Sequence, residues 1–161
     1  MAKPTWKELV SRPNPLLLPV AHDALTARLI QRAGFDAYSV GGFALVGARY
    51  GIPDIGLVGL AEMAAGVKDI MAACDLPILA DGVVGYGDVK NVTRTIRTYE
   101  QLGVSSIFIE DQVAPKRCGH MAGKDVISAE LMEAKLRAAA AARDSKDTLR
   151  IARTDATAAL G

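Results

Sequence analysis

Stretches with apolar residues at helical spacing alternate along this chain with short stretches that are apolar throughout. Helices are predicted after Thr5, from Asp23 to Gly34, over residues 60–74, from Asp88 to Gly103 and over residues 128–143. Strands are predicted at residues 16–18, 37–41, 77–80, 106–109 and 149–152. Because strands that alternate with amphipathic helices form βαβ units, we expect an α/β fold with a parallel sheet.

Two architectures satisfy this order of elements, an open doubly wound sheet and a (β/α)8 TIM-type barrel. A complete barrel takes eight strands and roughly 250 residues, whereas this sequence has 161 residues. After the last predicted strand the sequence reaches Gly161 without a predicted closing helix. We therefore expect residues 1–161 to form a single incomplete barrel domain, consisting of about the first five βα units.

Composition excludes several classes of function. Half of the residues are hydrophobic, 23% are charged and the net charge is +1, with the basic residues scattered. This profile is typical of a globular protein and predicts binding neither to nucleic acid nor to a membrane. The N-terminal sequence does not resemble a signal peptide, and the two cysteines do not indicate a disulfide framework, so we expect a cytoplasmic protein.

Carboxylates stand at the carboxyl ends of several predicted strands, where parallel α/β folds place their reactive groups. Asp81 and Glu110 each end a strand, and Asp54 lies in a glycine-flanked turn. Carboxylates that converge from different strands repel one another unless a cation or a proton lies among them, and hard oxygen ligands suit Mg²⁺. A single acid at such a position is more often a helix cap or a solvated loop residue, but several together favour a metal site.

A loop with the sequence Lys116-Arg-Cys118-Gly-His120 follows the fourth predicted strand. Its basic residues favour a thiolate and can hold an anionic substrate, and its glycine allows the loop to close as a lid. The alternative is a surface loop with an incidental thiol. A zinc site is disfavoured because Cys118 and His120 supply only two ligands.

Two further positions are candidates for anion binding. Arg153, at the end of the last predicted strand, can grip a carboxylate with two hydrogen bonds or form a structural ion pair with Asp155. Gly41 and Gly42 open a glycine-rich loop before a possible helix, where backbone N–H groups can face an anion. Glycines in tight turns are common, so Gly41 and Gly42 by themselves are weak evidence for anion binding.

Taken in order, these motifs resemble the isocitrate lyase/phosphoenolpyruvate mutase superfamily over essentially the whole chain. The motifs are Gly-Ile-Pro-Asp-Ile-Gly at residues 51–56, Leu-Ala-Asp and Gly-Tyr-Gly at 79–81 and 85–87, Ile-Glu-Asp-Gln at 109–112, the 116–120 loop, and Ile-Ala-Arg-Thr-Asp at 151–155. The cysteine-containing loop is similar to that of the lyase branch, which includes methylisocitrate lyase, 2,3-dimethylmalate lyase and oxaloacetate hydrolase. The phosphonomutases carry a different loop without this cysteine.

The resemblance implies three groups of site residues. The Mg²⁺ site, where Mn²⁺ could substitute, consists of Asp81, Asp54 and Glu110. The substrate-binding residues are Tyr38, Gly41, Gly42 and Arg153. The catalytic residues are Cys118, Lys116 and His120, with Cys118 as the acid that protonates the leaving carbanion.

The function that the resemblance implies is Mg²⁺-dependent cleavage of a carbon–carbon bond in a small 2-hydroxy dicarboxylate of the methylisocitrate or dimethylmalate type. The products would be an α-keto acid and a carboxylate, and the full-length form is expected to be a homo-oligomer. Action on a 2-keto dicarboxylate as an oxaloacetate hydrolase or decarboxylase, or as a carboxyphosphonoenolpyruvate phosphonomutase-like enzyme, is an alternative.

The sequence also departs from the family's pattern at two positions. Val83 stands where the family's metal loop usually carries the second acid of an Asp-x-Asp motif, and Val40 stands where many members have Ser or Thr. Valine cannot accept a hydrogen bond from a water molecule on the metal. A role outside catalysis, as a catalytically inactive barrel fragment or an assembly subunit, is therefore a further alternative to the enzyme functions.

Overall fold

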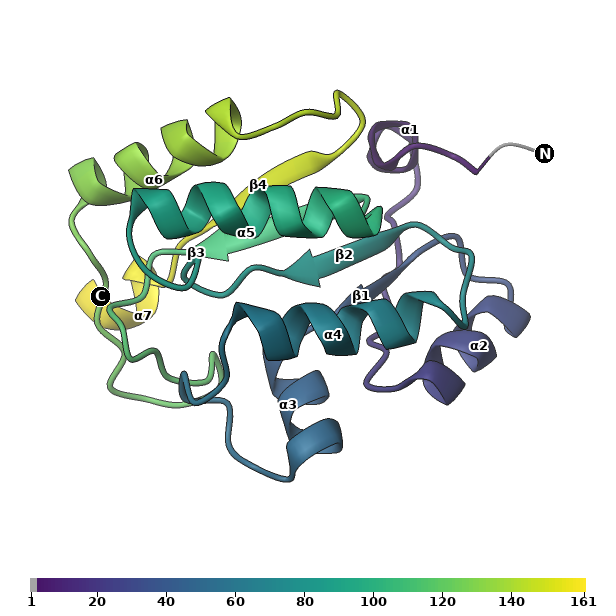
Figure 1. The fold of residues 1–161 in the computed structure, drawn as a ribbon, viewed down its shortest axis with the longest axis horizontal. Coiled ribbons are helices and arrows are strands. Elements are labelled where there is room, and N and C mark those ends of the chain that lie inside the picture. Colours follow the sequence, from purple (N-terminus) through teal and green to yellow (C-terminus); the bar gives the residue numbers. More distant parts are fainter. Residues whose placement is uncertain (1–2) are drawn as a thin grey trace.

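The computed structural model describes residues 3–161 and shows a four-stranded parallel sheet with helices packed against it (Figure 1). The strands lie in the order β1 (Tyr38–Val40), β2 (Ile78–Asp81), β3 (Ser106–Glu110) and β4 (Leu149–Arg153). The helices are α1 (Trp6–Val10), α2 (Ala24–Arg32), α3 (Gly42–Tyr50), α4 (Leu60–Met71), α5 (Val89–Leu102), α6 (Ala129–Ala141) and α7 (Ala156–Leu160). The predicted parallel α/β fold is confirmed.

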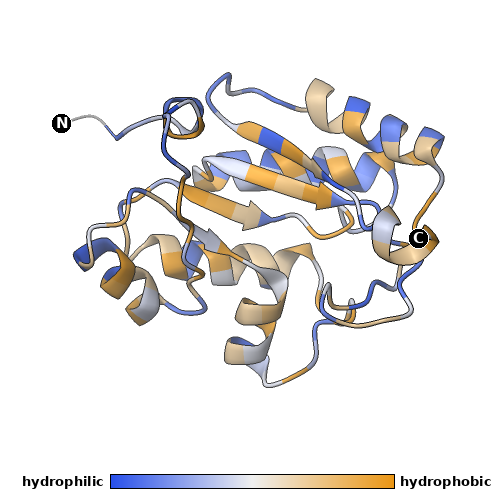
Figure 2. Ribbon diagram, turned by 180° about the vertical axis from the view of Figure 1, so that it is seen from behind, coloured by the Kyte–Doolittle hydropathy of each residue, from blue (hydrophilic) through white to orange (hydrophobic). Residues whose placement is uncertain are grey.

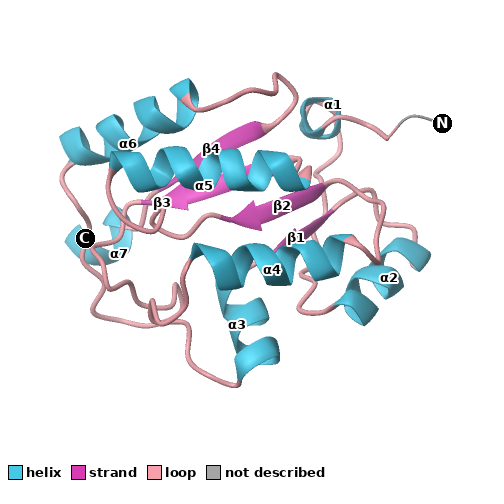
Figure 3. Ribbon diagram, viewed as in Figure 1, coloured by secondary structure: helices cyan, strands magenta, loops and turns pink. Residues whose placement is uncertain are grey.

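Each strand pairs in parallel with the next one along the chain, so all carboxyl ends lie at one edge of the sheet. Helices α4, α5 and α6 cover one face of this sheet (Figures 1 and 3). Viewed from behind, the strands lie in front of these three helices (Figure 2). Across residues 3–161, no helix combines the length and apolarity needed to cross a bilayer.

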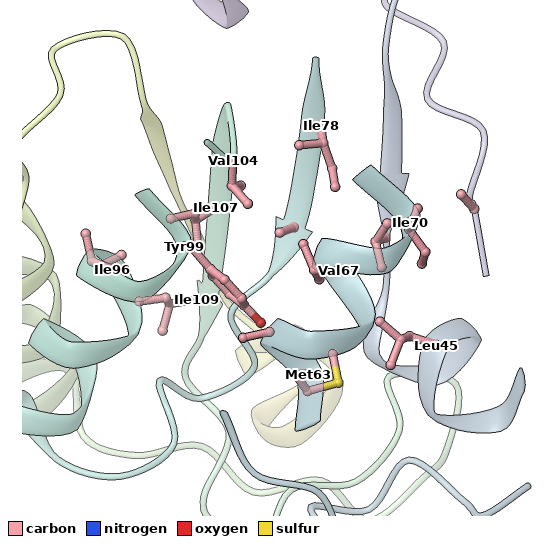
Figure 4. Packing of buried hydrophobic residues seen from close by; sticks show 14 of the residues in the cluster. Leu45, Met63, Val67, Ile70, Ile78, Ile96, Tyr99, Val104, Ile107 and Ile109 are labelled. Atoms are coloured by element: carbon pink, nitrogen blue, oxygen red, sulfur yellow. The ribbon is translucent and has the colours of Figure 1, made fainter. Parts of the chain in front are cut away.

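The main hydrophobic core lies between the covered face and helices α4 and α5 (Figure 4). Met63 and Val67 of α4 and Ile96 and Tyr99 of α5 have no exposed surface. Each such side chain contributes roughly 1.5–3 kcal/mol by leaving water, so packing rather than intrinsic propensity stabilises these helices. The strand residues of the core are Tyr38, Val40, Ile78, Ala80, Ile107 and Ile109.

A second, smaller cluster surrounds helix α1 and includes the buried side chains of Trp6 and Leu9. Leu79 and Leu149 pack against it from β2 and β4. Side chains alternate between the two faces of a strand, so Leu79 points away from the buried neighbours Ile78 and Ala80. Helix α1 thus covers part of the face that α4, α5 and α6 leave open.

Helix starts follow the side-chain caps expected from the sequence. The Thr5 side chain and Glu8 form a capping box at α1, and the side chains of Asp23, Asp88 and Ser128 accept hydrogen bonds from the first turns of α2, α5 and α6. Such caps each contribute about 1 kcal/mol. At the end of α5, Gly103 adopts a left-handed conformation with φ of 84° and turns the chain into β3.

Residues 16–18 do not form the predicted strand. The chain there reaches the sheet later, at a single parallel bridge between Val20 and Ser39. Pro15 and Pro19 have no N–H group to donate, which prevents a continuous ladder in this segment. The predicted count of five strands is therefore wrong, because four strands form the sheet of residues 3–161.

Two helices differ from the expectation made from the sequence. After β1, where a glycine-rich loop before a possible helix was expected, α3 begins directly at Gly42, and its Leu45 and Val46 are buried. Glycines lower helix propensity, and tertiary packing overrides this weak local preference. After β4 the chain continues into α7, so the expectation that no helix follows the last strand is wrong as well.

Gly82 permits a close approach between β2 and β3. Its N–H donates to the carbonyl oxygen of Phe108 at 2.8 Å, and a Cβ atom on Gly82 would lie 2.6 Å from the same oxygen. Because a backbone oxygen cannot move without disturbing β3, we expect Gly82→Ala to lower the free energy of unfolding by about 1–3 kcal/mol. Urea denaturation followed by circular dichroism measures this change.

Gly47→Ala provides a matched control for this substitution. Gly47 lies in the exposed part of α3, and a Cβ atom there would meet nothing within 4 Å. Alanine stabilises an exposed helix by roughly 1 kcal/mol relative to glycine, so this variant should match or exceed the original stability. Equal destabilisation by both variants would contradict the steric explanation for Gly82.

Candidate active site

The carboxyl edge of the sheet gathers the side chains that the sequence predicts for catalysis. Asp81, Glu110 and Arg153 are the last residues of β2, β3 and β4. The segment between β3 and α6, residues 111–128, carries the predicted lid and lies at the same edge as α7 (Figure 1). Parallel pairing therefore brings together residues that are far apart in the sequence.

Asp81 is buried, and backbone N–H groups hold its carboxylate. Gly42 N–H donates to Oδ2 at 2.7 Å, and Val83 N–H donates to Oδ1 at 2.8 Å. Burial raises the pKa of Asp81, against the opposing effect of these two hydrogen bonds and of the Lys116 charge. The carboxylate is thus held in one orientation by the backbone around it.

Asp54 lies next to Asp81 and pairs with Lys116. The distance from Lys116 Nζ to Asp54 Oδ2 is 2.5 Å, and both side chains are buried. A Cβ atom on Gly42 would lie 3.1 Å from Asp81 Oδ2 and 3.2 Å from Asp54 Oδ2. The glycine at position 42 therefore leaves room for two carboxylates at the start of α3.

Glu110 completes the group of acids and is also almost fully buried. Arg153 Nη1 lies 3.1 Å from Glu110 Oε2, and Gln112 Nε2 donates to Glu110 Oε1 at 3.2 Å. Burial, followed by the charge of Asp81, raises the pKa of Glu110 to about 7, whereas Lys116 and Arg153 lower it. Glu110 therefore changes its charge near neutral pH in the metal-free chain.

Arg153 connects this acid to the following turn. Its Nη2 donates to Asp155 at 3.1 Å, and its guanidinium group lies 5.9 Å from the centre of the Phe108 ring. The ion pair with Asp155 that the sequence suggested is therefore present, and the binding of a substrate carboxylate by Arg153 stays a prediction. Its side chain remains about one-third exposed.

The loop after β3 places a thiol beside an imidazole ring. Cys118 Sγ lies 3.5 Å from His120 Nδ1, and the His120 ring packs edge-on against Phe43 of α3 at 5.9 Å. Cys118 is 7% exposed, so the loop lies closed over its own thiol. Lys124 Nζ ties the loop to the turn after β4, donating to Gly119 O at 2.8 Å and to Asp155 Oδ1 at 3.1 Å.

Three of the predicted substrate-binding residues have structural roles here. The side chain of Tyr38 is fully buried in the main core beside Cys74, and its hydroxyl finds no hydrogen-bond partner among residues 3–161. Gly41 caps α3, and the N–H group of Gly42 is already bonded to Asp81. The structure therefore brings Tyr38 into the packing of the sheet rather than into the group of charged residues.

Three buried polar residues of the site were not predicted from the sequence. Gln112 bridges Glu110 and Asp155, and Lys124 also contacts Asp155. Lys135 of α6 is 6% exposed and donates from Nζ to the carbonyl oxygen of Val84, in the loop after β2. A lysine between Met132 and Ala139 on the buried stripe of α6 was the signal that could have revealed it.

The loop after β2 is strained at Val83, which has φ of 52°. A branched side chain in the left-handed region is an outlier and costs about 1–3 kcal/mol. The backbone fixes this conformation, because Val83 N–H donates to Asp81 and Val83 O accepts from Glu110 N–H at 2.9 Å. The backbone of Val83, the residue that departs from the family's pattern, is thus hydrogen-bonded to both Asp81 and Glu110.

The acids suit a hard divalent cation by the chemistry of their oxygen atoms rather than by a preformed cluster. Over residues 3–161, no three His, Cys, Asp or Glu side chains stand close enough together to form a ready metal cluster. The Lys116 ammonium group provides the positive charge among the acids, since it pairs with Asp54 and lowers the pKa of both Asp81 and Glu110. Buried carboxylates that gather around one positive charge have the ligand chemistry that Mg²⁺ prefers.

The raised pKa of Glu110 predicts how stability depends on pH when no metal is present. A glutamate has a pKa near 4.3 in the unfolded chain and about 7 here, so the folded chain holds this proton more tightly. Its stabilising effect is complete below about pH 4 and is lost as the pH rises to about 7. We expect Glu110 to lower the free energy of unfolding in EDTA by at most about 4 kcal/mol over this range.

Urea denaturation of the wild-type chain and of Glu110→Gln at pH 5.0 and 7.5 tests this expectation. The difference between the two proteins in this pH dependence separates the contribution of Glu110 from that of Asp81, whose pKa is raised as well. The variant should show the smaller loss of stability with rising pH. Glu133→Gln, at an exposed position on α6, should behave like the wild type. Equal pH dependence in all three proteins would refute the assignment.

Comparisons with known proteins place this arrangement in a family. The family described as phosphoenolpyruvate phosphomutase matches residues 6–159. A 2,3-dimethylmalate lyase from Eubacterium barkeri is 43% identical over 155 residues, which cover 96% of this chain and 54% of that protein. The chain thus spans about half the length of this relative.

Solved structures agree with this likeness. A complex of oxaloacetate acetylhydrolase with the inhibitor 3,3-difluorooxalacetate has a TM-score of 0.89 and 34% identity, covering 95% of this chain and 53% of the other. A complex of phosphonopyruvate hydrolase with oxalate and Mg²⁺ has a TM-score of 0.79 and 32% identity, covering 89% and 49%. The match of sequence and fold shows that this chain belongs to the isocitrate lyase/phosphoenolpyruvate mutase superfamily.

Proposed function

We propose that this chain belongs to a Mg²⁺-dependent lyase that cleaves a carbon–carbon bond in a small 2-hydroxy dicarboxylate. The observation that carries the proposal is the group of buried carboxylates, Asp81, Asp54 and Glu110, gathered around the Lys116 ammonium beside the loop that holds Cys118. The likeness to 2,3-dimethylmalate lyase supports this class of reaction. We also propose that the full-length protein forms a closed (β/α)8 barrel with this site at its mouth, and that it assembles into a homo-oligomer.

Each residue has a role that follows from its chemistry. Asp81, with Asp54 and Glu110, would hold Mg²⁺, and the ion when bound supplies a positive charge that stabilises negative charge developing on the substrate. Arg153 is partly exposed and has the planar donors that grip a carboxylate. The Lys116 charge neutralises Asp54 and attracts an anionic substrate to the same place.

Bond cleavage requires two proton movements. The substrate hydroxyl releases its proton to the medium, the carbon–carbon bond breaks to leave a carbonyl group, and the electron pair of the broken bond stays on the departing carbon next to its carboxylate. Cys118 donates its S–H proton to that carbon, and the thiolate regains a proton from the medium when the products leave. His120 Nδ1, at 3.5 Å from the sulfur, stabilises the thiolate in between.

Calorimetric titration of the EDTA-treated chain with MgCl₂ tests the metal part of the proposal. One Mg²⁺ should bind, and Asp81→Ala should abolish this binding, whereas Asp75→Ala should not, because Asp75 is exposed. Turnover of 2-methylisocitrate, 2,3-dimethylmalate and oxaloacetate is then measured with bound Mg²⁺. Failure to bind Mg²⁺ would contradict the proposal and favour a catalytically inactive chain.

Hydrolysis of the carbon–carbon bond in oxaloacetate is a second candidate function. It is favoured by the likeness to oxaloacetate acetylhydrolase, which has a TM-score of 0.89. The two candidates differ in the fate of the carbon that stays behind, because hydrolysis adds water to this carbon and lysis does not. Turnover of oxaloacetate together with inertness toward both 2-hydroxy acids would decide for hydrolysis.

A further inference from the structure

Gln112 lies at the centre of the contacts between the loop and the acids, although its side chain carries no charge. It follows β3 directly and is 2% exposed. Its Nε2 donates to Glu110 Oε1 at 3.2 Å and to Asp155 Oδ2 at 3.1 Å, and its Oε1 accepts from Arg117 N–H at 3.0 Å. The amide nitrogen therefore binds the two acids, and the amide oxygen binds the backbone of the loop.

The chemistry of these partners fixes the orientation of the amide. Two carboxylates require donors, and a backbone N–H requires an acceptor, so a flipped amide would lose all of these bonds. Each buried polar group left without its partner costs about 1–3 kcal/mol. Glutamine therefore fits this position better than glutamate, which would place a third negative charge beside Glu110 and Asp155.

The base and the tip of the loop are held in different ways. Backbone bonds close the base, from Val113 N–H to Asp125 O at 2.8 Å and from Ile127 N–H to Asp111 O at 2.9 Å. Side chains hold the tip, where Lys116 pairs with Asp54 and the backbone of Arg117 bonds to Gln112. Arg117 immediately precedes Cys118, so the Gln112 amide anchors the chain at the position of the reactive thiol.

We propose that Gln112 is a positioning residue whose side-chain amide ties the backbone at Arg117 to the carboxylates of Glu110 and Asp155, and thereby holds the loop closed over Cys118. The loop position then depends on an acid of the site, because Glu110 is a partner of the same amide. The inference deepens the proposed function, since it names what keeps the proposed acid catalyst in place. It requires neither bound metal nor turnover.

The rate at which iodoacetamide alkylates Cys118 in the complete 161-residue chain reports on the loop. Peptide mass spectrometry separates Cys118 from Cys74, which lies in the main core and serves as an internal reference for general loosening. In EDTA and without substrate, Gln112→Met should raise the alkylation rate of Cys118 at least tenfold and leave that of Cys74 unchanged. Methionine has a similar length and makes none of the three hydrogen bonds.

Two further variants make the test specific. Gln112→Glu keeps an acceptor for Arg117 N–H but repels both acids, so it should also raise the Cys118 rate at least tenfold. Gln101→Met changes an exposed glutamine of α5 and should leave both cysteines at their original rates. Hydrogen exchange should accelerate in residues 114–123 of both Gln112 variants and remain unchanged in α4 and α5.

The outcomes are distinguishable from failure of the proposed function. A Cys118 rate within twofold of the wild type in both folded Gln112 variants would overturn the inference. A parallel rise for Cys74 and Cys118 would also overturn it, because it would show general destabilisation. Absence of Mg²⁺ binding or of turnover in the wild-type chain would leave the alkylation result intact and would count against the proposed function alone.

Discussion

Replacement of Cys118 by serine should lower kcat by about 10²–10⁴-fold in the Mg²⁺-loaded chain and leave the affinity for Mg²⁺ unchanged. An alcohol is a far weaker acid than a thiol, so serine cannot deliver the proton to the departing carbanion. The sulfur lies beside His120, whereas the Asp81 and Asp54 carboxylates bond to Gly42, Val83 and Lys116. Glu110 bonds to Gln112 and Arg153. Steady-state kinetics and calorimetry measure the two quantities separately.

Cys74→Ser makes the same atomic change away from the site. Cys74 is buried in the main core near Tyr38, so its replacement should cost stability without a change of more than about twofold in kcat. Normal turnover by Cys118→Ser would show that this thiol is not the acid. Loss of Mg²⁺ binding in the same variant would show that the sulfur acts through the metal site instead.

The strand ends and most helices followed from the sequence because strong local signals agree with the final packing there. Asp88 and Gly103 delimit α5 as cap and terminator, and Asp81 and Glu110 end buried apolar strands. Parallel pairing then places the acids at one edge without further information. The location of the site was therefore readable from the order of the elements.

The details that the sequence did not provide depend on contacts between distant segments. Helix α3 forms because Leu45 and Val46 are buried, in spite of its glycines. Gln112 and Lys124 looked like ordinary loop residues, and they acquire their importance only when β4 brings Asp155 to them. A polar side chain gains meaning from its partners, and its partners are set by the tertiary fold.

Tyr38 shows the limit of carrying a role over by position. Tyr38 is the first residue of β1, and alternation along the strand directs its side chain into the core with Val40. The phenol is buried, and burial raises its pKa above the usual range. Its contribution to substrate binding remains a prediction that the geometry of the side chain does not support by itself.

Substitution of Val83 by aspartate should tighten Mg²⁺ binding by about 10–100-fold, the range typical of changes in the outer shell of a metal site. Val83 follows Asp81 by two residues, and its backbone bonds to both Asp81 and Glu110, so a carboxylate at this position would adjoin two of the proposed ligands. Valine offers no oxygen there and adopts φ of 52°, a conformation that aspartate tolerates better than a branched residue. Calorimetric titration with MgCl₂ measures the change.

Two companion variants separate the added oxygen from the relief of strain. Val83→Gly removes the strain without adding a ligand, and Val83→Asn adds a neutral oxygen in a residue that tolerates positive φ. If charge and ligation dominate, affinity should rise in the order Gly, Asn, Asp. Equal affinities for Val83→Gly and Val83→Asp would attribute any gain to the backbone alone. If Val83→Asp bound Mg²⁺ no more tightly than the wild type, the absence of a carboxylate at position 83 would not be what limits the affinity for the metal. The closeness of the acids would then be explained by the charge of Lys116.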